Sequence, residues 1–160
     1  MALKSTFSHA DIRKELEAGI KQVKEAFLQI LKQAGEESVQ QARANAHTID
    51  ASGRLAASIG YVIVADGMVV ARDFLPMPDA PASAPDGTEA EPPVNEAQQG
   101  ESLAYELAAQ YGKGYALIVV SGSEYAVQAE SMSKDVLTGA EMYVGKTVTD
   151  ALEKLRKGKV

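Results

Sequence analysis

The sequence predicts an α+β domain in which a small, mostly antiparallel sheet with a β-hairpin packs against a long N-terminal helix and a C-terminal helix. Three observations predict this class: an apolar stripe at helical spacing near the N-terminus, an Asp-Gly pair between two β-branched runs, and a second helical stripe near the C-terminus. The 160 residues fit one domain, and we expect it to span residues 1–160 with a loop inserted at about 75–98.

The first predicted element is a long helix. Ser8 and Asp11 are spaced as a capping box at its start. Gly35 interrupts the apolar pattern and a more polar helical stretch follows to Ala46, so we expect a marginal or kinked helix whose stripe needs a partner. The stripe follows steps of mostly three and four and consists of Ile12, Leu16, Ile20, Val23, Phe27, Ile30 and Leu31.

A β-hairpin is predicted after a turn and a short helical piece. The β-branched runs 61–65 and 68–71 flank Asp66 and Gly67. An Asp-Gly pair suits a type I′ turn, because both central positions of that turn need positive φ. The first strand is expected to begin at Tyr61.

The composition changes abruptly after this hairpin. All six prolines lie between Pro76 and Pro93, and residues 73–112 contain eight acidic residues but no lysine or arginine. Proline removes backbone donors and the acids repel one another, so we predict an extended loop over residues 75–98 that stays outside the core. Carboxylates suit hard cations, but their spacing lacks the alternation of a calcium loop, which favours a solvated segment.

Regular structure is predicted to return after the loop. We expect a short amphipathic helix built on Leu103, Ala104, Leu107, Ala108 and Tyr111. The continuous apolar run 115–120 predicts a central strand buried on both faces. Capping boxes are expected at Ser121 with Glu124 and at Thr138 with Glu141. The last of these begins a helix whose stripe continues through Val148, Ala151, Leu152 and Leu155.

Charge and composition exclude several classes of function. Acidic residues outnumber basic ones by 22 to 16, which disfavours a sequence-reading DNA binder because that role needs a basic face. The absence of cysteine excludes disulfides and thiolate chemistry. No apolar run approaches the ~18 residues of a membrane span, and the N-terminus lacks the core of a signal peptide. We therefore expect a soluble protein made in a reducing cytoplasm.

Short motifs that could carry chemistry are better explained by local structure. His47, Asp50 and Ser52 are the residue types of a catalytic triad, but they lie within six residues, too close to converge from separate elements. Residues 112–114 lack the spacing of a phosphate loop, which favours the end of a helix and the start of a strand. The basic residues Lys154, Arg156, Lys157 and Lys159 either complement the dipole of the last helix or meet an acidic neighbour.

Two segments resemble the neck and tail-completion proteins of long-tailed bacteriophages. Residues 52–61, SGRLAASIGY, followed by Asp66-Gly67 resemble the T-G-x-L-R/A-x-S-I segment and hairpin of that family. Residues 125–130, YAVQAE, fall where the family has Y-A-x-x-V-E-x-G. The order of elements agrees over nearly the whole chain. The departures are Ser52 for threonine, Ala129 for valine and the lack of a glycine after Ser131.

The resemblance implies a structural virion protein of the head–tail joining class that forms a ring, expected to be six-fold, around the DNA passage. It implies no catalytic residue, cofactor or metal. Its partners would be further copies, neighbouring neck, connector and tail-tube proteins, and DNA that passes without sequence-specific binding, with no membrane contact. The protein would be made in the host bacterial cytoplasm and lie in the virion neck or tail. The motif and packing residues would be Gly53, Leu55, Ser58, Ile59, Gly60, Tyr125 and Glu130.

The charge layout predicts how two copies meet. We expect the acidic loop of one copy to contact the basic C-terminal end of the next. Two alternatives remain open: a small acidic immunity-type or regulatory binding protein, which would be a monomer or dimer, and an enzyme, which a deep polar pocket with perturbed carboxylates would indicate. The residues of the expected interface are Asp79, Asp86, Glu89 and Glu91 on one copy and Lys154, Arg156 and Lys157 on the other.

Overall fold

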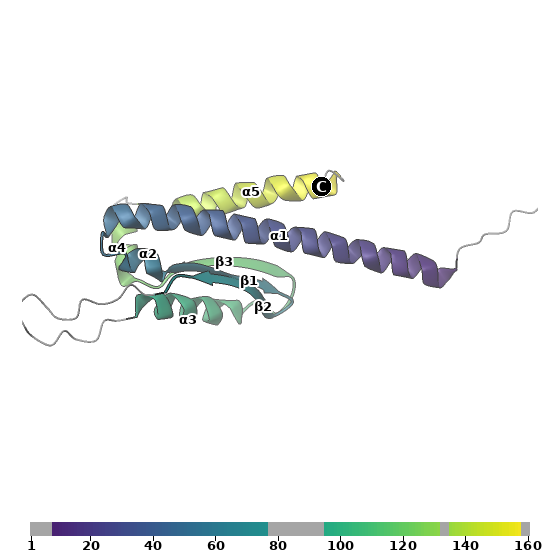
Figure 1. Cartoon of the computed structure of the whole chain (residues 1–160), viewed down its shortest axis with the longest axis horizontal. Coiled ribbons are helices and arrows are strands. Elements are labelled where there is room, and N and C mark those ends of the chain that lie inside the picture. Colours follow the sequence, from purple (N-terminus) through teal and green to yellow (C-terminus); the bar gives the residue numbers. More distant parts are fainter. Residues whose placement is uncertain (1–7, 77–94, 132–134, 158–160) are drawn as a thin grey trace, which may run out of the picture.

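The computed structural model describes residues 8–76, 95–131 and 135–157. Figure 1 shows the sheet between α1 on one face and α3 on the other, with α5 lying along α1 and with α2 and α4 at the end where α1 ends. The predicted α+β class, with its hairpin, long N-terminal helix and C-terminal helix, is confirmed. The elements are α1 (His9–Ile49), α2 (Arg54–Ser58), β1 (Ile59–Ala65), β2 (Met68–Phe74), α3 (Glu96–Ala108), β3 (Tyr115–Ser121), α4 (Glu124–Ser131) and α5 (Thr138–Arg156).

The hairpin between β1 and β2 forms where the sequence predicts it. Asp66 and Gly67 have φ values of 48° and 85°, so both central positions of the turn are left-handed, as predicted. The turn is bonded to Gly114, the residue before β3. The Asp66 N–H donates to the Gly114 carbonyl at 2.8 Å, and the Gly114 N–H donates to the Asp66 carboxylate at 3.1 Å. Both strands are longer than predicted, since β1 begins at Ile59 and β2 continues to Phe74.

The central strand is β1, and the prediction that residues 115–120 form it is wrong. The sheet has the order β2-β1-β3 with both pairings antiparallel, which places β3 at an edge. β1 is buried from Ile59 to Val64. Gly60 and Tyr61 interrupt its aliphatic run, so β3 has the more continuous apolar sequence although it occupies the less buried position.

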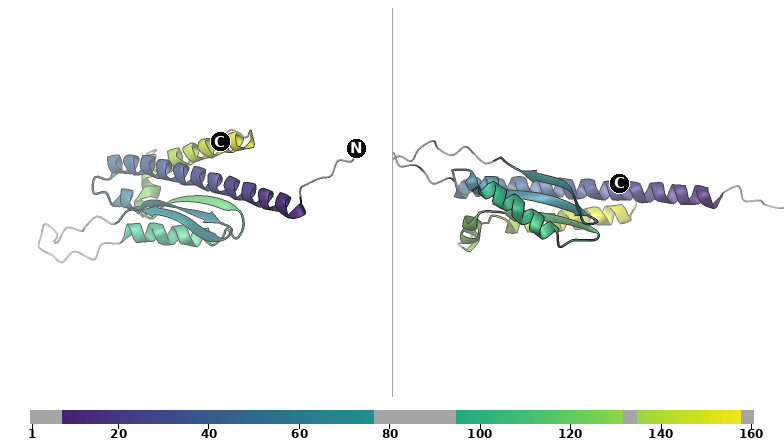
Figure 2. Two further views of the ribbon diagram at one scale, coloured as in Figure 1. Left: turned by 45° about the vertical axis from the view of Figure 1, so that its right-hand side comes forward. Right: turned by 90° about the horizontal axis from the view of Figure 1, so that it is seen from below.

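The core has two parts, one on each face of the sheet. Because successive residues of a strand point to opposite faces, Ile59, Tyr61 and Ile63 belong to the core on the α1 side of the sheet, whereas Val62 and Val64 pack against α3. Burial raises the pKa of Tyr61 to about 12, with further contributions from Glu36 and Asp73. Figure 2 shows the same sandwich from two further directions.

α1 is a continuous helix of 41 residues with the predicted capping box at its start. The Asp11 N–H donates to the Ser8 hydroxyl at 3.2 Å, and the Ser8 N–H donates back to the Asp11 carboxylate. Gly35 does not interrupt the helix. A Cβ atom at this position would lie 3.0 Å from the ring of Tyr61, so the glycine allows α1 to approach the sheet closely.

α3 begins earlier and packs through smaller residues than predicted. Asn95 caps the helix, so residues 96–98 are helical rather than part of the loop, and the remainder of the predicted loop beyond Pro76 lies outside the described residues. Leu103 and Tyr111 are 38% and 48% exposed, which corrects their placement on the inner face. The buried face consists of Ala97, Gly100, Ala104 and Ala108.

Neither predicted capping box in the C-terminal part of the chain forms. Ser121 lies in β3, and its hydroxyl pairs with the Ser58 hydroxyl at 2.9 Å instead of capping α4. Thr138 is the first residue of α5 rather than its cap, and no side chain of the cap residue bonds the helix. Glu130 of α4 and Asp135 accept from the free N–H groups of α5 instead. Glu130 lies in α4, seven residues before Leu137, so a local capping pattern could not reveal its contact.

Candidate functional site

The N-terminal half of α1 carries an exposed apolar stripe. Figure 1 shows this half extending beyond the sheet and beyond α5. The stripe consists of Ile12, Leu16, Ile20 and Val23, which are 56%, 63%, 49% and 57% exposed.

The stripe continues the spacing of residues that are buried further along the same helix. From Ile12 to Ala34 the steps are four, four, three, four, four and three, and Leu31 and Ala34 are buried against the body of the protein. A helix face with this spacing is normally covered, and monomeric proteins rarely leave such a contiguous apolar surface open. The N-terminal half of α1 therefore has the pattern of a core-facing helix, and the described part of the chain leaves its apolar face exposed.

A shallow apolar hollow lies where the stripe meets the body. It has a volume of about 640 Å³ and includes the side chains of Lys24 and Arg156 beside its apolar walls. Phe27 and Tyr115 pack edge to face within it, with ring centroids 5.0 Å apart. Leu152 of α5 is 44% exposed there. The apolar surface thus continues from α1 onto the last turns of α5.

A second hollow, of about 480 Å³, lies between α1 and α5 further along both helices. The Tyr143 hydroxyl donates to the Glu37 carboxylate, and this bond, together with one from Gln33, holds the pKa of Glu37 below its usual value. Lys154 and Asp150 also line this hollow. The interaction joins the two helices and involves a partly buried pair of side chains.

The predicted motif residues meet at a buried junction between α2 and the sheet. Gly53 has a φ of 77° and precedes α2, and Leu55, Ser58 and Ile59 are at most 1% exposed. The Ser58 hydroxyl donates to the Leu55 carbonyl at 2.8 Å. A Cβ atom on Gly60 would lie 2.2 Å from the Phe74 ring. These residues set the close packing at the start of β1 and present no exposed chemical group.

The other two motif residues lie in α4. Tyr125 is part of the helix, and its side chain falls outside the described residues. The Glu130 carboxylate accepts from the N–H groups of Leu137 and Thr138 at 2.6 and 3.3 Å, and from the Thr138 hydroxyl. The bond from Leu137 lowers the pKa of Glu130 most; partial burial opposes it and the bonds from Thr138 add to it. Glu130 therefore fixes the start of α5.

Of the two sets of residues in the predicted charged interface, the structure describes the basic set and not the acidic set. Lys154, Arg156 and Lys157 occupy the end of α5, where Lys157 also pairs with Glu153 at 3.2 Å. Lys159, which completes the basic run, lies outside the described residues, as do the acidic residues Asp79, Asp86, Glu89 and Glu91.

His47, Asp50 and Ser52 do not form a triad. The Asp50 carboxylate accepts from the Ser52 N–H at 2.9 Å, from the Ser52 hydroxyl at 2.8 Å and from the Leu55 N–H at 3.0 Å. Burial raises the pKa of Asp50, but these bonds outweigh it and hold the pKa below its usual value. Asp50 is thus a structural residue of the turn before α2.

Comparison of the chain with protein-family models, with curated proteins and with solved structures gives no match. Across the described residues, no three His, Cys, Asp or Glu side chains lie together in an arrangement that could hold a metal ion. No helix in the described part of the chain combines the length and apolar character that crossing a bilayer requires.

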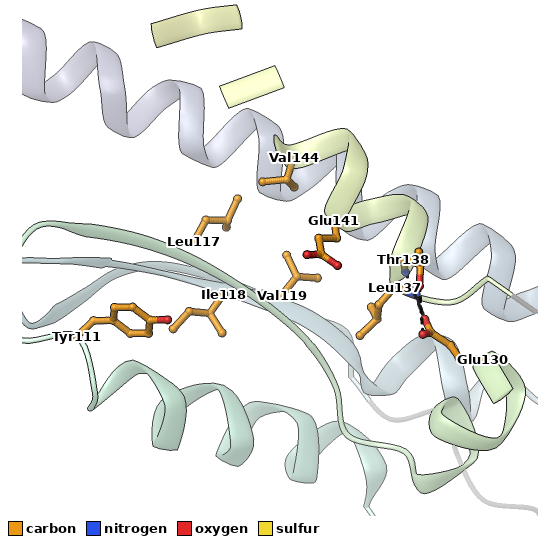
Figure 3. A pocket seen from close by; sticks show the side chains of 9 residues that line it. All are labelled: Tyr111, Leu117, Ile118, Val119, Glu130, Leu137, Thr138, Glu141 and Val144. Carbon is orange, nitrogen blue, oxygen red and sulfur yellow. Dashed lines mark hydrogen bonds between the residues drawn. The ribbon is translucent and has the colours of Figure 1, made fainter. Parts of the chain in front are cut away.

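A third hollow, of about 410 Å³, was not anticipated from the sequence. Figure 3 shows it beside β3, with Leu137, which precedes α5, and Glu141 and Val144 of α5 above the strand and Tyr111 below it. The sequence predicts that residues 115–120 form a central strand buried on both faces. That prediction does not anticipate an open edge.

Proposed function

We propose that the protein is a structural virion protein of the phage neck or tail, of the head–tail joining or tail-completion class, which assembles as a ring around the DNA passage. The observation that carries this proposal is the exposed apolar stripe of α1. The order of elements supports it, since a long helix, a short helix, a hairpin, a third strand and a C-terminal helix follow one another as in the family that the motif segments resemble.

A ring requires two different surface patches on each copy, because the contact must run head to tail and close by rotation. The stripe lies at one end of the molecule. The end of β2 and the start of α3, between which the acidic segment runs, lie at the other end (Figure 1). This separation suits a head-to-tail contact, whereas a two-fold dimer would need one self-complementary patch.

Apolar burial would supply most of the affinity. Removing one fully exposed Leu or Ile side chain from water is worth about 1.5–3 kcal/mol. The four stripe residues are each roughly half exposed or more, so covering them contributes several kcal/mol before the entropy cost of association. Charged contacts would mainly set orientation and salt sensitivity.

The test disrupts the stripe without disturbing the fold. Leu16→Glu combined with Ile20→Glu places two charges on the stripe, and Ala18→Glu places one such charge on the opposite side of the same exposed helix as a control. Particles of each variant are imaged by negative stain, alone and with candidate neck components, and incorporation into virions is measured.

We expect ring particles and virion incorporation for the unchanged protein and for Ala18→Glu, and loss of both for the stripe variant. A protein that stays monomeric with every neck component and never enters a particle would contradict the proposal. A monomer or dimer that instead binds a basic protein would favour the immunity-type alternative. Turnover of a substrate that is lost on mutating one polar residue would identify an enzyme.

A further inference from the structure

The outer edge of β3 carries unpaired backbone groups. The Asp66 N–H bonds the Gly114 carbonyl and the Gly122 N–H bonds the Ser58 carbonyl, so both ends of the β1–β3 ladder are fixed. Hydrogen-bonded pairs alternate along an antiparallel ladder. Ala116, Ile118 and Val120 therefore bond β1, and the residues between them direct their N–H and C=O groups outward. Within the described part of the chain, no backbone or side-chain group bonds these outward groups.

The two edge strands of the sheet, β2 and β3, differ in how well they are protected against pairing with another strand. β2 has an irregular register opposite Ile63 and Val64, and it carries Arg72 and Asp73, features that hinder pairing with another strand. β3 has the sequence YALIVVS, with no charge, proline or glycine. An edge strand of this kind readily accepts a further strand.

The hollow beside β3 has the form that strand addition requires. Its lining includes Leu117 and Val119 from one face of β3 and Ile118 from the other, so the hollow follows the edge of the strand (Figure 3). An added strand gains affinity from main-chain hydrogen bonds and specificity from the pockets that receive its alternate side chains. Here those pockets would be formed by α5 on one side and by Tyr111 on the other.

We propose that the edge of β3 accepts the N-terminal segment Met1–Phe7 of a second copy as an added strand. This inference deepens the proposed assembly and rests on it, because it supplies one contact between neighbouring copies.

The charge of the hollow favours this segment over the other candidates. Glu130 and Glu141 are its charged lining residues, and no cation lines it. A second β3 would bring the same two acids into the contact. The segment 77–94 is acidic and rich in proline, which cannot donate to a ladder. Residues 1–7 contain Lys4, no acid and no proline.

Residues 1–7 are too few to reach the edge of β3 in their own chain, so the proposed contact requires a second copy. Phe27 packs against Tyr115, the first residue of β3, so α1 holds Ser8 at a distance of about 28 Å from that point at 1.5 Å per residue. Seven extended residues span at most about 25 Å. The hollow continues from β3 toward α4, and α4 lies at the opposite end of the molecule from the start of α1 (Figure 1). The segment therefore cannot occupy the edge of β3 in its own chain.

Cross-linking tests the contact directly, because the chain contains no cysteine of its own. A full-length chain with Ser5→Cys is mixed with a differently tagged full-length chain with Val144→Cys, and the mixture is oxidised. The control replaces Val144→Cys by Lys146→Cys, an exposed position on another side of α5. We expect the mixed disulfide from Ser5→Cys with Val144→Cys and little from the control mixture. Equal yields, or no mixed disulfide in ring particles, would overturn the inference.

A charge exchange tests the same contact by a second route. Lys4→Glu or Glu141→Lys alone should lower the cross-linking yield severalfold, and the two together should restore it. Glu106→Lys, on the outer side of α3, should leave the yield unchanged. Failure of the exchange to restore the yield would also contradict the inference. Rings without this cross-link would refute the strand addition alone, whereas the cross-link in a protein that never enters a virion would refute the proposed function alone.

Discussion

At Gly67 the backbone φ is 85°, and the Gly112 carbonyl oxygen lies 3.3 Å from the position that a Cβ atom would take. Gly67→Val therefore introduces both backbone strain and a close contact, and we expect it to lower the free energy of unfolding by about 1–2 kcal/mol or more. Gly112→Val is the matched control, because no atom lies within 4 Å of its Cβ position. Denaturant unfolding measures both, and equal stability of the two variants would contradict the turn geometry.

Two helical glycines should respond to alanine in opposite directions. A Cβ atom on Gly100 would lie 2.3 Å from the Ser58 carbonyl oxygen, so Gly100→Ala must push α3 away from the end of α2. Overpacking of this kind costs about 1–3 kcal/mol. Gly145 in α5 has no atom within 4 Å of its Cβ position, and Gly145→Ala should stabilise the protein by about 0.5–1 kcal/mol. Thermal unfolding of the two variants checks the signs, and a stable Gly100→Ala protein would mean that α3 is less closely packed than described.

Between elements, the bond from Glu130 to the start of α5 gives stability that depends on pH. The pKa of Glu130 is lowered by folding, so its contribution is complete above its ordinary value of 4.5 and is lost as the pH falls through the lower, folded value. We expect Glu130→Gln to cost about 1 kcal/mol at pH 7, as for the loss of a helix cap. The difference from the unchanged protein should shrink below about pH 4. A difference that is constant from pH 7 to pH 3 would exclude this role.

The elements differ in how far their sequence determines them. Ser8, Asp11 and the Asp66-Gly67 pair act on residues within four positions, and the structure confirms both the helix start and the turn. The start of α5 depends on Glu130, seven residues before Leu137, through a contact that exists only after α4 and α5 have packed. Likewise, Ala97, Gly100 and Ala104 form an inner face whose small side chains give little apolar signal.

The candidate site was also predictable only in part, because some of its features follow from local spacing and others from long-range packing. The stripe from Ile12 to Val23 is evident from spacing, and the expectation that it lacks a complete cover follows from the small size of the remaining elements. The open edge of β3 depends on strand order, which requires long-range pairing of β1 with both neighbours. The apolar run of β3 resembles that of a central strand, so only the sheet topology distinguishes the two positions.

At the scale of the whole molecule, the proposed assembly predicts a dependence on the basic end of α5. Lys154→Glu with Arg156→Glu reverses two charges there and should reduce ring formation, because the acidic segment of the next copy would then be repelled. Lys113→Glu with Lys146→Glu reverses the same number of charges elsewhere and serves as the control. Light scattering with neck components measures the particles formed. Equal loss in both double variants would indicate an effect of net charge rather than of a contact.

The projection of α1 beyond the body has a consequence for the exchange of its amide hydrogens with solvent. From Phe27 onward, opening the helix also requires breaking its packing against the sheet and α5. From Ser8 to Ile20, the contacts within the described part of the chain that oppose opening are the helical hydrogen bonds, the capping box and surface pairs such as Lys21 with Glu25. Local stability therefore falls toward the N-terminus in a free copy, and amides there should exchange quickly. If a neighbouring copy covers the stripe in the proposed assembly, the same amides should become slow, so protection along this one helix would report the state of assembly residue by residue.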